Sequence, residues 1–276
     1  MPAVAILGAG PIGASVAHRL AQRGRVPSIA VIDAAAAVAA GKVLDIQQSG
    51  PVERFDTPLS SLGDELAAAA APVVVVADEH AAGPWEGDRG LALLDRLVRA
   101  GSKAAFVFAC PSQTWLMEKC YTELKVPADR LIGAAPSAMV GAVQGVAGLE
   151  LGLSAVELTV VGRPPALVIG WSAAAVDGSL VSEQIPAHRL LAISAMLPRL
   201  WPPKPYAIAS AAAPIVEALL SGSRKRHAAL TVIDGSLGAR GRAVMLPLGL
   251  GRGRVLSHVI PSLSPQERTE MVNGIG

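Results

Sequence analysis

Aromatic residues, cysteine and charge are all scarce in this chain, and each scarcity excludes a class of protein. Aromatic side chains make up 3% of the 276 residues, charged side chains make up 17%, and the cysteines are Cys110 and Cys120 alone. Two cysteines form neither a disulfide framework nor a zinc-ligand pattern, so we expect a reducing, cytoplasmic setting and no metal. Hydrophobic residues reach 51% and the formal net charge is +2, which excludes an intrinsically disordered chain.

Long apolar segments and concentrated basic patches are also lacking. The longest run without a charged residue, Leu131–Leu149, is interrupted by glycines, a proline and polar residues. We therefore expect it to form a helix at a packed interface and not to span a membrane. The first basic residue is Arg19, so no signal peptide is expected. Basic residues of the second half are scattered and lack interleaved aromatic residues, which favours solvated loops or an anionic ligand over a nucleic-acid surface.

Short apolar runs and helical patterns alternate along the first half of the chain. This alternation predicts an α/β fold with a Rossmann-type, doubly wound parallel sheet over residues 1–133. The expected strands are Val4–Leu7, Ser28–Ile32, Val73–Val76, Ala104–Ala109 and Leu131–Gly133, and the expected helices are 11–23, Val38–Ile46, Gly90–Ala100 and Ser112–Leu124.

The pattern changes after about residue 150, where strands separated by glycine-rich turns follow one another. Residues 134–276 are therefore expected to form a C-terminal α+β domain that ends in an antiparallel meander and a capped helix. The expected strands are Val156–Val161, Ala166–Ile169, Ala228–Ile233, Ala243–Leu248 and Val255–Ile260, and the expected helices are Ala187–Leu200, Ala207–Leu220 and one that begins after Ser264.

A glycine-rich motif stands directly after the first expected strand and opens the first helix. It reads Gly8-Ala9-Gly10-Pro11-Ile12-Gly13, in which the glycines allow a tight turn, close approach of a pyrophosphate and close helix–strand packing. Asp33 follows Gly13 by twenty residues, where a carboxylate accepts hydrogen bonds from ribose hydroxyls. Since four alanines follow Asp33, we expect NAD and not NADP. The alternative is a turn that uses glycine only for backbone freedom.

Further segments, taken in order, resemble the lactate/malate dehydrogenase family over nearly the whole chain. Gly41-Lys42-Val43-Leu44-Asp45-Ile46 with Pro51 resembles the family's G-K-x-x-D-L…P, and Ala109-Cys110-Pro111 stands where the family has T-N-P. Leu149-Glu150-Leu151-Gly152-Leu153 resembles L-x-x-x-L-G-V, and Pro205-Tyr206-Ala207 resembles part of S-A-Y-Y-A-P-A. The resemblance implies an NAD-dependent 2-hydroxy acid dehydrogenase fold, with Ala77 and Cys110 beside the cofactor.

The resemblance also implies that the side chains which catalyse the family's reaction are replaced here. The family uses a His–Asp pair to move the hydroxyl proton, an arginine that binds the substrate carboxylate and a second arginine on a mobile loop. Counting back from Leu151, the Asp position is Met139 and the carboxylate-binding Arg position is Ala142. The His position is Pro164, which cannot transfer a proton. Arg89 is the candidate for the loop arginine.

Other side chains leave alternatives open. His80, His188 and the Cys110 thiol are candidates for chemistry, although a loop residue, a helix start and a small buried residue are the favoured explanations. The first hypothesis is an NAD(H)-binding family member that lacks the dehydrogenase reaction and acts as a sensor, scaffold or inactive subunit. The second is an active NAD-dependent oxidoreductase on an unidentified substrate, with rearranged catalytic residues such as Arg89, Arg163 or His188. The third is a structural protein with a vestigial cofactor site.

Two further expectations concern size and assembly. The chain is shorter than its family pattern between Pro165 and Tyr206, where the family builds the far wall of its substrate pocket. The apolar run Leu131–Leu149 has more apolar surface than one subunit buries, so we expect a homo-oligomer, specifically a dimer.

Overall fold

The central sheet of the molecule begins with six parallel strands. The computed structural model describes residues 1–152 and 155–276. The parallel strands are β1 Val4–Leu7, β2 Ile29–Ile32, β3 Leu59–Leu62, β4 Val73–Val76, β7 Ala105–Phe108 and β8 Leu131–Gly133. Their order across the sheet is β8-β7-β4-β1-β2-β3, and all five neighbouring pairs are parallel. This arrangement confirms the predicted Rossmann-type fold.

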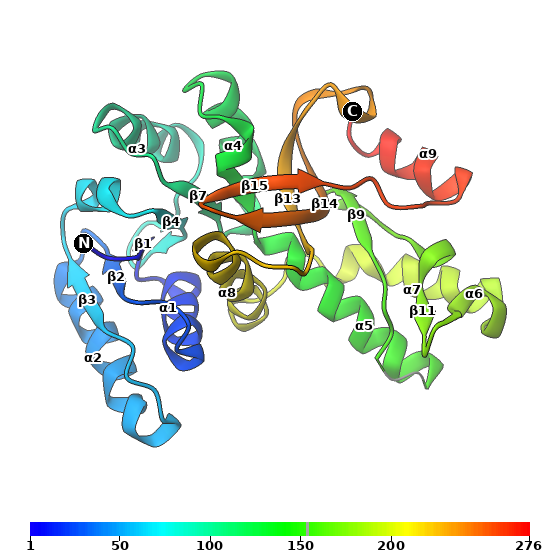
Figure 1. The fold of residues 1–276 in the computed structure, drawn as a ribbon, viewed down its shortest axis with the longest axis horizontal. Helices are drawn as coiled ribbons and strands as arrows, with labels where there is room; N and C mark the ends of the chain where they lie inside the picture. Colours follow the sequence, from blue (N-terminus) through cyan, green and yellow to red (C-terminus); the bar gives the residue numbers. More distant parts are fainter. Residues whose placement is uncertain (153–154) are drawn as a thin grey trace.

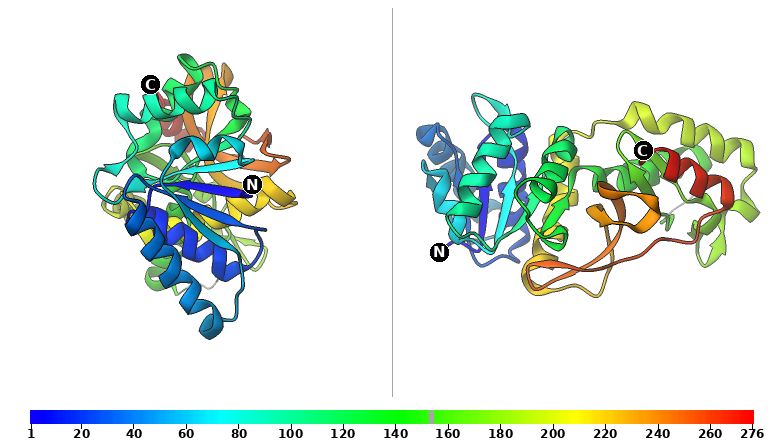
Figure 2. Two further views of the ribbon diagram at one scale, coloured as in Figure 1. Left: turned by 90° about the vertical axis from the view of Figure 1, so that its left-hand side faces the viewer. Right: turned by 90° about the horizontal axis from the view of Figure 1, so that it is seen from above.

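Helices cover both faces of these strands, as the end-on view of Figure 2 shows. The cause is visible along β4, where the four valines point alternately to opposite faces and each is 0% exposed. Odd-numbered side chains such as Val73 pack with α1, α2 and α8, and even-numbered ones such as Val74 pack with α3 and α4. The helices are α1 Pro11–Arg23, α2 Ala36–Glu53, α3 Gly87–Arg99, α4 Thr114–Thr122 and α8 Pro205–Ser221.

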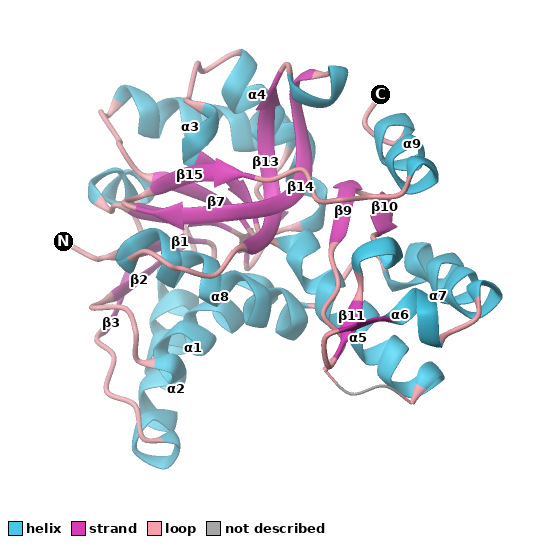
Figure 3. Ribbon diagram, turned by 45° about the vertical axis from the view of Figure 1, so that its right-hand side comes forward, coloured by secondary structure: helices cyan, strands magenta, loops and turns pink. Residues whose placement is uncertain are grey.

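The second half of the chain extends the same sheet with antiparallel strands (Figure 1). The order continues from β8 through β13 His227–Asp234, β14 Arg240–Gly251, β9 Val160–Arg163 and β10 Ala166–Ile169, and β15 Arg254–His258 pairs with β14. The antiparallel pairing of β13, β14 and β15 confirms the predicted meander. The remaining elements are α5 Ala138–Leu151, β11 Ala175–Val176, β12 Ser179–Leu180, α6 Val181–Gln184, α7 Ala187–Leu200 and α9 Pro265–Asn273, and α5, α6, α7 and β11 lie together in Figure 3.

Several predicted boundaries are wrong. The strand predicted at Leu131–Gly133 is present as β8, so the helix expected over Leu131–Leu149 begins only at Ala138, after a turn through Pro136. The strand expected at Val156–Val161 begins at Val160, and α2 continues past its predicted end to Glu53. The strand Leu59–Leu62 was not predicted, because its inner serines hide the apolar pattern. Residues 153 and 154, which include the last residue of the family-like L-x-x-x-L-G-V segment, lie outside the described part.

The two halves of the chain are joined by hydrogen-bonded strands and by helix packing. Strand β8, at whose end we predict the domain boundary, pairs with β13 through Ile132 and Gly133. Helix α8 comes from the second half, yet it packs against α1 in the first. We propose that the chain consists of two domains, residues 1–133 and 134–276. None of the helices described is both long and apolar enough to cross a membrane.

Candidate functional site

The glycine motif forms the turn between β1 and α1. Gly8 has φ +113°, and a Cβ atom there would lie 2.1 Å from the carbonyl oxygen of Asp78. A Cβ on Gly13 would lie 2.1 Å from the carbonyl oxygen of Gly8. A Cβ on Gly10 would lie 2.6 Å from the carboxyl carbon of Asp78. Glycine is therefore required at all three positions by contacts within the chain itself.

The carboxylate of Asp78 lies at the N-terminus of α1. Its Oδ1 atom accepts hydrogen bonds from the backbone N–H of Gly13 at 2.8 Å and of Ile12 at 3.0 Å. The backbone carbonyl of the same Asp78 accepts a further bond from Gly10 N at 2.8 Å. The free N–H groups and partial positive charge of a helix N-terminus bind anions. Here the bound anion is a side chain of the protein, 6% exposed.

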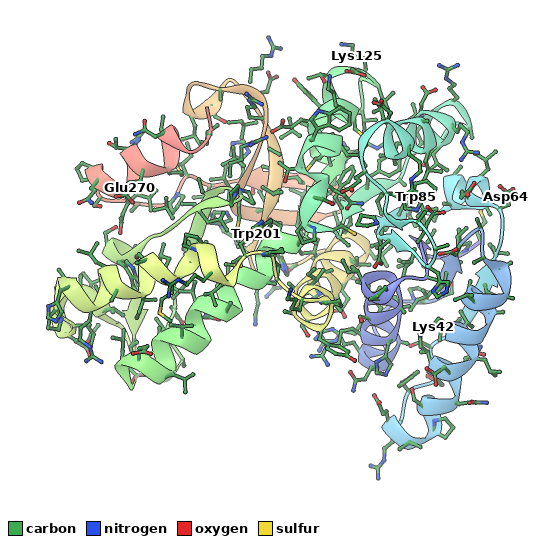
Figure 4. All side chains as sticks on the ribbon, turned by 180° about the vertical axis from the view of Figure 1, so that it is seen from behind. Lys42, Asp64, Trp85, Lys125, Trp201 and Glu270 are labelled. Atoms are coloured by element: carbon green, nitrogen blue, oxygen red, sulfur yellow. The ribbon has the colours of Figure 1, made fainter. Side chains whose placement is uncertain are left out.

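A short hairpin holds Asp78 in this position. Strand β5 Asp78–Glu79 pairs antiparallel with β6 Gly83–Pro84. Arg89 forms an ion pair with Glu79 and stacks 4.3 Å from the ring centre of Trp85, whose place beside α3 is labelled in Figure 4. Arg89, the candidate loop arginine, therefore contacts residues of the hairpin and of the segment that follows it, and stabilises the hairpin.

Asp33 joins the end of β2 to both the glycine turn and the hairpin. Its Oδ2 atom accepts hydrogen bonds from Ala9 N at 2.8 Å and His80 N at 3.0 Å, and its Oδ1 atom accepts one from Ala35 N at 2.8 Å. The side chain is 2% exposed. The residue proposed to hold a ribose therefore already has backbone donors on both oxygens.

Ala77 and Cys110 follow the ends of β4 and β7, at the edge of the sheet where the parallel strands end. The amide of Gln113, 1% exposed, accepts from Cys110 N at 2.9 Å and donates to the carbonyl oxygen of Trp85 at 2.8 Å. Burial raises the pKa of the Cys110 thiol, and the charges of Asp78 and Glu86 raise it further. A thiol with a raised pKa stays protonated at neutral pH and is a poor nucleophile.

A cleft of about 610 Å³ opens beside the glycine turn. It is lined by Gly10 and Pro11 of the glycine turn, by the exposed residues Lys42 and Asp45 on α2, and by Tyr206 at the start of α8. Figure 4 shows Lys42 on this helix. Three residues of the glycine motif, Ala9, Gly10 and Pro11, therefore border an open space large enough for a nucleotide.

In this conformation the glycine turn does not fit a dinucleotide pyrophosphate. The N–H groups of Ile12 and Gly13 are bonded to Asp78, and the space above Gly10 holds the same carboxylate. Asp33, Asp78 and Glu79 are each less than 8% exposed, so this edge already carries buried negative charge. No group of three or more His, Cys, Asp or Glu in the described ranges is placed to hold a metal ion.

Two of the three positions matched to the family's catalytic residues are packed into the interior. Met139 on α5 is 0% exposed, Pro164 at the turn between β9 and β10 is buried, and Ala142 is half-buried. The alternative catalytic residues lie apart: Arg163 bonds to the carboxylate of Glu118, Arg89 is held in the hairpin and His188 lies exposed at the start of α7. Within the part of the chain described, no hydrogen bond or ion pair joins any two of these three.

Asp78 was missed as a site residue by the sequence reasoning, although a signal was present. Two consecutive acids follow the buried valine strand after a single alanine, Ala77, and the carboxyl ends of parallel strands meet at one edge of the sheet. Since β4 is the neighbour of β1, a carboxylate after β4 lies beside the glycine turn after β1. Gln113 carries no comparable signal, because its role depends on the packing of α4.

Comparison with known proteins gives consistent matches. Residues 3–95 match the family model for the lactate/malate dehydrogenase NAD binding domain, which supports NAD as the cofactor. The malate dehydrogenase of Thermomicrobium roseum is 26% identical in an alignment that covers 97% of this chain and 93% of the relative. Among solved structures, Enterococcus mundtii minor L-lactate dehydrogenase has a TM-score of 0.85 at 18% identity, covering 99% of this chain and 94% of that one. Malate dehydrogenase from Salinibacter ruber has a TM-score of 0.83 at 21% sequence identity, in an alignment that covers 98% of this chain and 93% of that one. At these identities the two structures show the fold alone.

Proposed function

We propose that this chain, which belongs to the lactate/malate dehydrogenase family, binds NAD(H) through its N-terminal half without catalysing the family's 2-hydroxy acid dehydrogenation. It then serves as a sensor, a scaffold or an inactive subunit. The observation that carries the proposal is the set of residues at the positions of the family's His, Asp and Arg. These are Pro164, Met139 and Ala142, none of which can exchange a proton or bind a carboxylate.

The size of the expected defect follows from the lost groups. General acid–base help typically contributes about 10²–10⁴ in rate, and Pro164 and Met139 supply none. A bidentate arginine adds charge-assisted bonds to a substrate carboxylate, which the methyl group of Ala142 does not replace. Because Met139 is 0% exposed, its position also offers no space in this packing for a substrate.

The test separates cofactor binding from turnover. We expect the fluorescence of NADH to change on addition of the protein, with no consumption of NADH in the presence of pyruvate or oxaloacetate. An active malate dehydrogenase, assayed in the same buffer, serves as the positive control. NADH oxidation above about 1 s⁻¹, within the ordinary range of enzymes, would refute the proposal in favour of an oxidoreductase with rearranged catalytic residues. Absence of NADH binding would favour a structural protein with a vestigial cofactor site.

We also propose a cytoplasmic homodimer that uses neither nucleic acid nor membrane as a partner. Its support is the surface of α5, where Leu149 is 89% exposed and Gly141 and Gly145 are exposed beside it. Small exposed residues allow a second helix to approach closely, and an exposed leucine gains from burial. Light scattering at micromolar concentration should give twice the chain mass of 28.1 kDa, and a monomer mass would exclude this dimer.

A further inference from the structure

We propose that Asp78 is a built-in occupant of the pyrophosphate position, so that a dinucleotide binds only after this carboxylate has left the N-terminus of α1. The inference rests on the proposed binding of NAD(H) by the N-terminal half. It goes further by assigning one residue the control of that binding. The hairpin that carries Asp78 becomes a tethered competitor of the cofactor.

The first argument is the hydrogen-bond geometry. The Asp78 carboxylate takes the N–H of Ile12 at 3.0 Å and of Gly13 at 2.8 Å, and both are first-turn donors of α1. Such N–H groups have no partner within their helix and point outward. A carboxylate and a phosphate are both oxyanions that seek these donors, so the two compete for the same atoms.

The second argument is the space above the middle glycine. A Cβ on Gly10 would lie 2.6 Å from the Asp78 carboxyl carbon and 2.6 Å from its Oδ2 atom. The absence of a side chain at this position of the motif lets a pyrophosphate approach the backbone. In this chain the group that makes the close approach is Asp78. Its carboxylate therefore occupies the space above Gly10 as well as the N–H donors of the helix.

The third argument is that the closed hairpin is fastened from several sides. The backbone of Asp78 accepts from Gly10 N, and Trp85 N donates to the carbonyl oxygen of Ala77 at 3.1 Å. His80 N donates to the buried Asp33. Because these bonds form together when the hairpin is closed, they favour the state in which Asp78 lies at the helix.

The expected effect follows from the fraction of molecules in which the site is open. A ligand that binds only the open state has an apparent Kd equal to its intrinsic Kd divided by the open fraction. If the closed hairpin leaves fewer than one molecule in ten open, removing the competing charge tightens binding at least tenfold. Asp78→Asn is the variant of choice, because the amide keeps the size and one acceptor oxygen but loses the negative charge. Asp78→Ala removes the competitor entirely.

The matched control is Asp88→Asn, which makes the same charge change at an exposed residue of α3. Binding of NADH to the wild type and the three variants is measured by calorimetry, after thermal melts have shown each to be folded. We expect Asp78→Asn to bind NADH at least tenfold more tightly than the wild type, with Asp88→Asn within twofold of the wild type. Equal affinities of the wild type and both Asp78 variants would overturn the inference while leaving the proposed function intact.

A second probe keeps the inference separate from the proposed function. If neither the wild type nor the Asp78 variants bind NADH, the proposed function fails, and inorganic pyrophosphate decides the inference alone. Pyrophosphate binding at least tenfold tighter to Asp78→Asn than to wild type supports the built-in occupant. Equal binding of pyrophosphate, or none to any form, overturns it.

Discussion

Asp33 is expected to stabilise the folded protein, in addition to any role in selecting a cofactor. The substitution Asp33→Asn tests the stabilising role. The side chain is 2% exposed and accepts three backbone hydrogen bonds, from Ala9, Ala35 and His80. An asparagine offers one carbonyl oxygen, so one side of the group must present N–H to a backbone N–H. The substitution therefore loosens the glycine turn, the start of α2 or the hairpin.

The magnitude follows from the bonds that are lost. A hydrogen bond to a charged group contributes about 1.5–3 kcal/mol, and a buried donor left without an acceptor costs about 1–3 kcal/mol. With one donor orphaned and the charge lost from the other bonds, we expect the free energy of unfolding to fall by about 2–4 kcal/mol.

Urea unfolding followed by circular dichroism measures this change as a lower midpoint with an unchanged slope. The control is Asp56→Asn, an exposed carboxylate whose replacement should shift stability by less than about 0.5 kcal/mol. If the two variants unfold at the same urea concentration, Asp33 does not hold the turn and hairpin together. Its burial then has no energetic role, and the reasoning is refuted.

Three further predictions concern other elements. Glu118→Ala leaves Arg163 without its carboxylate. It should lower the free energy of unfolding in urea by about 2–4 kcal/mol, slightly less than the loss caused by breaking a fully buried ion pair. An unchanged free energy contradicts this. Cys110 and Cys120 should resist a thiol reagent until the protein unfolds, since burial raises both thiol pKa values, that of Cys120 to about 12; rapid native labelling contradicts this. Burial raises the pKa of Glu267, but hydrogen bonds from nearby serines outweigh it and the net pKa is lowered. The wild type should therefore be more stable than Glu267→Gln at pH 7, and the difference should shrink as pH falls below about 4.3, the ordinary pKa of a glutamate, and through the lowered folded-state pKa; a difference that stays constant as pH falls contradicts this.

Much of the fold was predictable because its signals are local. The run Val73–Val76 is uniformly apolar, which is typical of a strand buried on both faces, and each valine is indeed fully buried. The capped helix after Ser264 also begins as predicted, with the Ser264 hydroxyl accepting from Glu267 N. By contrast, Leu59–Leu62 becomes a strand through pairing with β2, and its own sequence carries too few apolar residues to indicate it.

The places of the glycine motif and of Asp33 in the fold were predictable, but their hydrogen-bond partners were not, and their role in binding a cofactor stays a prediction. The glycine motif and Asp33 correctly indicated the turn after β1 and the end of β2, because each follows a strand directly. The sequence did not reveal that the donors of this turn are bonded to Asp78. That contact joins residues 65 positions apart and depends on a hairpin of two-residue strands, for which no periodic pattern exists.

The packing of α8 against α1 has a consequence for how the protein is made. The strands of the N-terminal half are complete once Gly133 has been synthesised, but one face of their core is closed by α8, which ends at Ser221. At about 5–20 residues per second, the ribosome needs roughly 4–18 s to supply the intervening segment. During that interval α1 can pack against the parallel strands and α2, but the part of its surface that contacts α8 stays uncovered. The N-terminal half therefore reaches its final packing only when most of the second half has left the ribosome.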